Sequence, residues 1–256
     1  MTRRAALVTL ALLLAASVGT MLWMRSRARV HPDSVTLPVD PARRGRPVRD
    51  PATIPAMLRD SSWQTRLGAA HALRTMSALS VPRRAVLLAE ALDREAGAPV
   101  SGPPFTGSYL PLRSMVRLQY LAVLESLGEP ATGAVRGASA PATSAGREWR
   151  ALAVSATGDK SSAPRLRELL ASADPAVRMT AARYLGYLED GAAIPALQRA
   201  LADPFAGTSV SDMPQGSGIG TPGGFHPVRE QAARALRVLG VKVERQGETY
   251  TVQLPP

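Results

Sequence analysis

The sequence predicts an all-α protein, an α-solenoid (superhelix) of about five helical hairpins that follows an N-terminal transmembrane helix. Three observations predict it. Arginines recur along the chain with the same apolar pattern after each one, prolines recur upstream of them, and 20 uncharged residues near the N-terminus form one apolar run. A recurring unit is typical of repeat architectures, because two short helices cannot bury their apolar face alone.

The recurring arginines mark the second helix of each hairpin. Arg178 is followed at offsets +3, +4, +7 and +10 by Ala181, Ala182, Leu185 and Leu188, which form one face of a helix. The same series starts at three further arginines and, with polar residues at its first and last positions, at a fourth: Arg66, Arg117, Arg229 and the weaker Arg147. The five arginines are 51, 30, 31 and 51 residues apart. A unit near 30 residues, with about 20 additional residues in each long gap, accounts for this spacing.

Prolines mark the first helix of each hairpin. They precede apolar stretches at Pro55 (or Pro51), Pro82, Pro130, Pro164 and Pro195. Proline suits the first helical turn, where its missing N–H would have no partner in any case. The unit is therefore helix, turn, helix. Small residues at offsets +3 and +4 let neighbouring units approach closely, and their stacking removes apolar surface from water at about 25 cal/mol per Å².

The best unit resembles a known family. Residues 163–170, followed by 174–178 and 181–186, look like HEAT repeats of the short bacterial type also called PBS-lyase HEAT-like. The resemblance covers about residues 51–240. It implies a ladder of hydrogen bonds in which turn aspartates and second-helix arginines tie neighbouring repeats together, Asp174 with Arg178 and Asp203 with Arg229. We therefore expect the ladder residues to build the scaffold and not to bind a ligand: Arg66, Arg117, Arg147, Arg178, Arg229, Asp174 and Asp203.

Two insertions, 97–111 and 205–226, occupy the long gaps. Both are rich in Gly, Pro and Ser without periodicity, as expected of loops between two helices. Because both lie between the first and second helix of their unit, they should emerge from the same edge of the repeat domain. Their aromatic residues, Phe105, Tyr109 and Phe225, make them candidate partner-binding loops.

Residues 1–29 are predicted to form a membrane anchor, with the apolar segment at 5–24. Twenty residues at 1.5 Å each span the roughly 30 Å hydrocarbon layer, and arginines flank the run on both sides. A cleaved signal peptide is the alternative. Residues 30–50, with four prolines, are expected to be a tether. We expect a single-pass protein of the cell membrane with a periplasmic repeat domain; the arginines after the segment favour the cytoplasmic side instead.

The C-terminal segment 241–256 alternates apolar and polar residues around Gln246 and Gly247, which predicts a small β-hairpin. Its simplest role is to cap the last repeat. A partner-binding strand edge is the alternative.

The composition of the chain excludes several kinds of catalytic and metal-binding site. The chain has no cysteine, which excludes disulfides and thiolate catalysis, and its three histidines (His31, His71 and His226) lack metal-ligand spacing. Of the net charge of +11, residues 1–50 carry +6, from nine arginines against three acids, so the repeats themselves are only weakly basic. We expect no catalytic site and no cofactor.

The expected function is a non-enzymatic, membrane-tethered scaffold or adaptor that binds protein partners. The alternative is an accessory subunit of a lyase or another modifying enzyme. A nucleic-acid partner ranks third, although Trp63 and Trp149 with Asp60 and Glu148 could imitate part of the binding face of HEAT-like DNA glycosylases.

Overall fold

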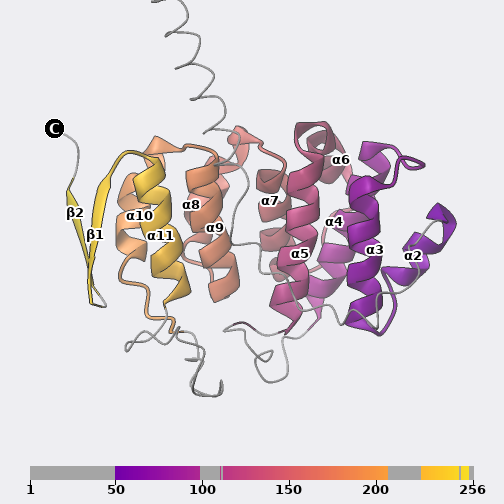
Figure 1. Cartoon of the computed structure of the whole chain (residues 1–256), viewed down its shortest axis with the longest axis horizontal. Helices are drawn as coiled ribbons and strands as arrows, with labels where there is room; N and C mark the ends of the chain where they lie inside the picture. The colour runs from indigo at the N-terminus through magenta and orange to yellow at the C-terminus, as the bar shows by residue number, and fades with distance from the viewer. Residues whose placement is uncertain (1–49, 99–109, 111, 207–225, 248, 254–256) are drawn as a thin grey trace, which may run out of the picture. The chain divides into compact units, whose positions relative to one another are not determined.

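The computed structural model describes residues 50–98, 110, 112–206, 226–247 and 249–253. These residues form ten α-helices and one two-stranded sheet (Figure 1). The helices make five consecutive hairpins: α2 (Ile54–Met57) with α3 (Trp63–Thr75), α4 (Val81–Gly97) with α5 (Leu112–Leu127), α6 (Thr132–Gly137) with α7 (Ser144–Ala156), α8 (Ala163–Leu169) with α9 (Pro175–Tyr187), and α10 (Ile194–Ala200) with α11 (Pro227–Val238). The prediction of an all-α fold of about five hairpins is confirmed for this part of the chain.

Local sequence signals place the helix starts. Ser62, Thr143 and Asp174 each accept a hydrogen bond from a backbone N–H in the first turn of the helix that follows, at α3, α7 and α9. Such side chains satisfy N–H groups that have no partner within the helix. Proline stands at one of the first two positions of α2, α4, α8 and α10, as predicted.

The apolar stripes of the second helices form the core. The side chains at offsets +3, +4 and +7 from four of the arginines are all buried: Ala69, Ala70 and Leu73 in α3, Tyr120, Leu121 and Leu124 in α5, Ala181, Ala182 and Leu185 in α9, and Ala232, Ala233 and Leu236 in α11. Successive second helices pack against one another, α3 on α5 and α9 on α11. The small residues of the stripe allow these close contacts.

The third hairpin interrupts the even stacking. Its second helix, α7, contacts α5 and α9 but packs most extensively on α4, the first helix of the preceding hairpin. Glu125 of α5 therefore reaches α9 directly, where it accepts hydrogen bonds from Arg183 Nη2 at 2.8 Å and from Tyr184 Oη at 2.6 Å. Burial and the neighbouring Glu125 raise the pKa of Tyr184 well above its usual value, so this hydroxyl stays a donor.

A β-hairpin follows α11, as predicted, with β1 (Lys242–Gln246) antiparallel to β2 (Thr249–Gln253). Gly240 has a left-handed φ of 82°, and the next N–H, of Val241, donates to Leu236 O at 2.9 Å. This arrangement ends α11 and turns the chain into β1. Val243 is buried, and Tyr250 Oη donates to Glu230 of α11 at 2.7 Å, so the hairpin packs on the last repeat.

Candidate interaction surface

The second-helix arginines lie in equivalent places and bind the turn before their own helix. Arg66 donates to Asp60 O at 2.7 Å, Arg178 to Ser172 O at 2.8 Å, and Arg229 to Asp203 O at 2.6 Å. Arg117, whose side chain is 1% exposed, donates to Glu95 O at 2.6 Å. Each guanidinium therefore satisfies carbonyls that the first helix and its turn leave without a partner.

In the third hairpin the structure corrects the sequence prediction. Arg147 is exposed, whereas Arg150 is buried and donates to Val135 O at 3.1 Å and to Ser139 O at 3.2 Å. Its guanidinium also pairs with Asp93 of α4. Arg150, and not Arg147, therefore occupies the position of the other four arginines.

The carboxylates pair differently from the prediction as well. The Asp203 carboxylate accepts from Arg178 Nε at 2.7 Å and from its Nη2 at 3.1 Å, so this side chain joins the arginine of the preceding repeat, while Arg229 binds the backbone carbonyl of the same residue. Asp174 lies 3.7 Å from Arg117 Nη1, and its other oxygen caps α9. The reason is geometric, because stacking places each turn beside the second helix of an earlier unit. The ladder arginines thus bind backbone carbonyls within their own repeat and carboxylates of other repeats.

The tryptophan pattern that imitates a DNA-binding face has a packing role at Trp149. Its side chain is fully buried and lies under the Arg117 guanidinium, 5.3 Å from the ring centroid. Burial lowers the pKa of Arg117, while Asp174 and Glu95 oppose that shift. Glu148 accepts from Ser172 Oγ at 2.9 Å, which ties α7 to the turn before α9.

Metal-binding clusters are absent among the residues that the structure describes. His71 is exposed on α3, 3.4 Å from Gln119 Oε1, and His226 Nδ1 lies 3.0 Å from Phe205 O at the start of α11. His31 lies outside the described residues.

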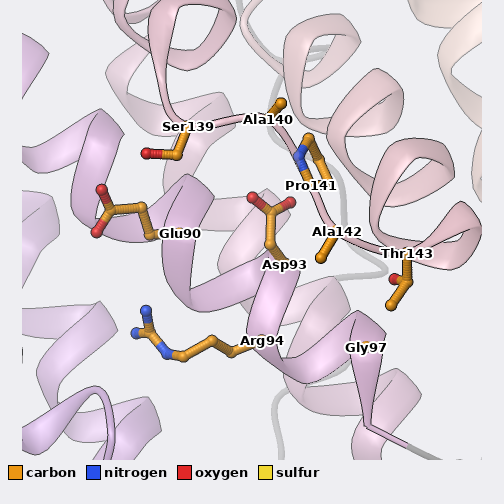
Figure 2. A pocket seen from close by; sticks show the side chains of 9 residues that line it. All are labelled: Glu90, Asp93, Arg94, Gly97, Ser139, Ala140, Pro141, Ala142 and Thr143. Atoms are coloured by element: carbon orange, nitrogen blue, oxygen red, sulfur yellow. The ribbon is translucent and has the colours of Figure 1, made fainter.

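One shallow groove lies beside the third hairpin (Figure 2). It has a volume of about 360 Å³ and is bounded by the C-terminal half of α4 and by residues 139–143 before α7. Burial raises the pKa of Asp93, which lines it, above its ordinary value, and Arg150 partly opposes this shift. Asp93 Oδ2 pairs with Arg150, while its Oδ1 is buried without a hydrogen-bond partner among the described residues. Because the groove is lined by α4 and by the turn whose Ser139 carbonyl Arg150 binds, it is part of the scaffold of this hairpin.

The second helices expose a different set of residues, which sequence reasoning did not single out. In the described part of the chain, two large apolar side chains are exposed, Tyr187 at 45% and Val238 at 62%. Both stand nine residues after the ladder arginine of their helix, Tyr187 after Arg178 and Val238 after Arg229. The offset +5 carries Arg183 and Arg234 in the same two helices. We call these four residues the α9–α11 face; the repeat register itself was the signal that could have found them.

The predicted partner-binding loops and the anchor fall outside the described residues. This holds for Phe105, Tyr109 and Phe225 and for the apolar segment 5–24. Among the described helices, none combines the length and apolarity that a membrane crossing requires.

A comparison with known families supports the repeat assignment. Residues 144–208 match the family model of HEAT repeats, which covers 65 of the 256 residues, from α7 through α10. The match supports a HEAT-repeat protein, a class of proteins that serve as protein-interaction scaffolds. No curated protein matches the chain.

Proposed function

We propose that this chain is a non-enzymatic scaffold that binds a protein partner through the α9–α11 face and is tethered to the membrane by residues 5–24. The observation that carries the proposal is the repetition of one exposed apolar position in two adjacent second helices, Tyr187 in α9 and Val238 in α11. These helices are packed side by side, at an axis separation of roughly 8–10 Å, so both side chains can contact one partner segment.

The chemistry of this face suits a protein partner. Tyrosine and arginine are, with tryptophan, the residues most enriched in binding hot spots, and the α9–α11 face presents both together with an exposed valine. Arg183 stacks on Tyr184, 5.4 Å from the ring centroid, and is held by Glu125, so its guanidinium is fixed before any partner arrives. A partner with an apolar anchor flanked by carboxylates would complement this arrangement.

Membrane tethering is supported by the sequence alone. The apolar segment has the length of a bilayer crossing, and arginines stand on both sides of it. We place the repeats in the periplasm. A topology reporter fused after Pro256 tests the side, and the same fusion on a chain lacking residues 1–29 tests the tether.

Site-specific photocrosslinking in native membranes tests the binding face. A photoreactive residue at Tyr187 or Val238 should crosslink the same protein. The matched control is Arg165, which is exposed on the first helix α8. The loops make a separate prediction, because removal of 205–226 should weaken capture if Phe225 contributes to the contact.

The identified partner is then measured against the purified chain. Tyr187→Ser and Val238→Ser should each weaken binding about tenfold or more, whereas Arg165→Ser should leave it unchanged. The proposal fails if Arg165 crosslinks the same proteins as the α9–α11 positions, or if neither serine variant alters the affinity.

A further inference from the structure

The C-terminal hairpin has one covered edge and one open edge. On β1, Val243 O accepts a hydrogen bond from Arg237 Nε of α11 at 3.2 Å. The backbone groups of Val243 therefore point away from β2, toward the last helix. Figure 1 shows β2 as the outer strand of the pair.

The register fixes which groups of β2 face outward. Val243 pairs with Val252, and Arg245 pairs with Tyr250. In an antiparallel ladder the two members of a non-hydrogen-bonded pair both direct their N–H and C=O groups away from each other, and such pairs recur at every second position. Val243 is a member of such a pair with Val252, and Arg245 forms the next one with Tyr250. The backbone N–H and C=O groups of Tyr250 and Val252 therefore point away from β1. Among the described residues, these backbone groups have no hydrogen-bond partner.

The open edge lacks the features that normally prevent pairing. Exposed edges are usually protected by charged residues, proline or a bulge. β2 reads Thr-Tyr-Thr-Val-Gln, without a charge, proline or glycine, whereas β1 carries Lys242, Glu244 and Arg245. Three of the five residues of β2 are exposed, Thr249, Thr251 and Gln253. Of the two strands, the one that α11 covers thus carries the charged residues.

We infer that the free edge of β2 pairs antiparallel with β2 of a second copy of this chain, across a two-fold axis at Thr251. In this register Tyr250 lies opposite Val252 of the other copy and Val252 opposite its Tyr250. Both positions carry the outward-facing groups, so four N–H···O=C bonds form and no outward group is left unpaired.

The side chains are self-complementary in the same register. Tyr250 meets a β-branched valine on the face toward α11, and Thr251 meets Thr251, both favourable cross-strand pairs. Thr249 lies opposite Gln253. No pair brings like charges together, which a strand with the charges of β1 would do. A second copy therefore fits this edge without any change in the hairpin. The result is a four-stranded sheet, and such a two-fold contact closes on itself.

Disulfide trapping tests the pairing, because the chain has no cysteine of its own. In the full chain, Thr251→Cys places two thiols on a non-hydrogen-bonded pair with Cα atoms about 4.5 Å apart, within the range that a disulfide spans. Glu244→Cys is the matched control, since Glu244 is exposed and lies opposite Thr251 on β1. Three strand spacings separate the two copies of that position, about 14 Å, which is too far.

Mild oxidation should convert Thr251→Cys to dimer at least about tenfold faster than Glu244→Cys. A mixture of Thr249→Cys and Gln253→Cys chains should give a mixed disulfide, while each alone should not. As a readout without thiols, the mass of the native chain in sedimentation should rise with concentration, and Thr251→Lys, which puts two ammonium groups on the axis, should remain monomeric. Equal trapping at 251 and 244, or a native chain that stays monomeric at the highest concentration reached, overturns the proposal.

Discussion

Two repeats approach closely at Gly186 of α9, and replacing this glycine by alanine tests how the repeats are packed. A Cβ at Gly186 would lie 2.8 Å from Ala235 Cα and 3.0 Å from Ala235 Cβ of α11. Carbon atoms in contact prefer about 3.5–4.0 Å, so α9 and α11 would have to separate by up to about 1 Å. Gly68 of α3 is the matched control, since a Cβ there would meet nothing within 4 Å.

The expected effects have opposite signs. Glycine inside a helix costs about 1 kcal/mol relative to alanine, so Gly68→Ala should raise the free energy of unfolding by about that amount. Gly186→Ala gains the same propensity but overpacks a buried contact, at a cost of about 1–3 kcal/mol. The net change should lie between zero and about 2 kcal/mol of destabilisation, and the two variants should differ by about 1–3 kcal/mol.

Urea unfolding of the full chain, followed by circular dichroism, measures the difference. In a thermal scan 1 kcal/mol corresponds to roughly 2–4 °C for a domain of this size. If Gly186→Ala stabilises the protein as much as Gly68→Ala does, α9 and α11 do not approach as the structure describes, and the packing argument for the second helices is refuted.

Three further substitutions probe the ladder, a helix end and a buried carboxyl. Arg150→Ala should destabilise by about 3–5 kcal/mol, because it leaves buried carbonyls and Asp93 without their partner, whereas Arg147→Ala should change stability by less than about 0.5 kcal/mol in the same urea assay. Glu189 follows α9 with a left-handed φ of 57°, a conformation that glycine adopts without strain. Glu189→Gly should therefore raise the free energy of unfolding by about 1 kcal/mol, measured as a higher melting temperature. Asp93 has a raised pKa in the folded chain; its stabilising effect is therefore fully present below its unfolded pKa and is lost as the pH rises through the folded value. Urea unfolding at several pH values should show the free energy of unfolding of Asp93→Asn rising relative to that of the native chain as the pH rises. If the two free energies change in parallel with pH, the prediction is contradicted.

The third hairpin shows where sequence reasoning reaches its limit. Arg147 gave near-even spacings of 30 and 31 residues, whereas Arg150 gives the less regular values of 33 and 28. The regular choice was wrong because the second helix of this unit, α7, packs most extensively on α4, the first helix of the preceding hairpin. The turn carbonyls therefore lie nearest the later arginine, a consequence of packing that periodicity does not encode.

The sequence by itself determined the repeat unit, the hairpins and the C-terminal strands. Each of these depends on interactions between residues close in the chain: apolar spacing, prolines at helix starts and alternation in strands. Tertiary structure decided the pairing of Asp203 with Arg178, the bridge from Glu125 to α9 and the exposure of Tyr187 and Val238. These are contacts between helices, and a helix with a given face can meet several neighbours equally well until the stacked backbone fixes the distances.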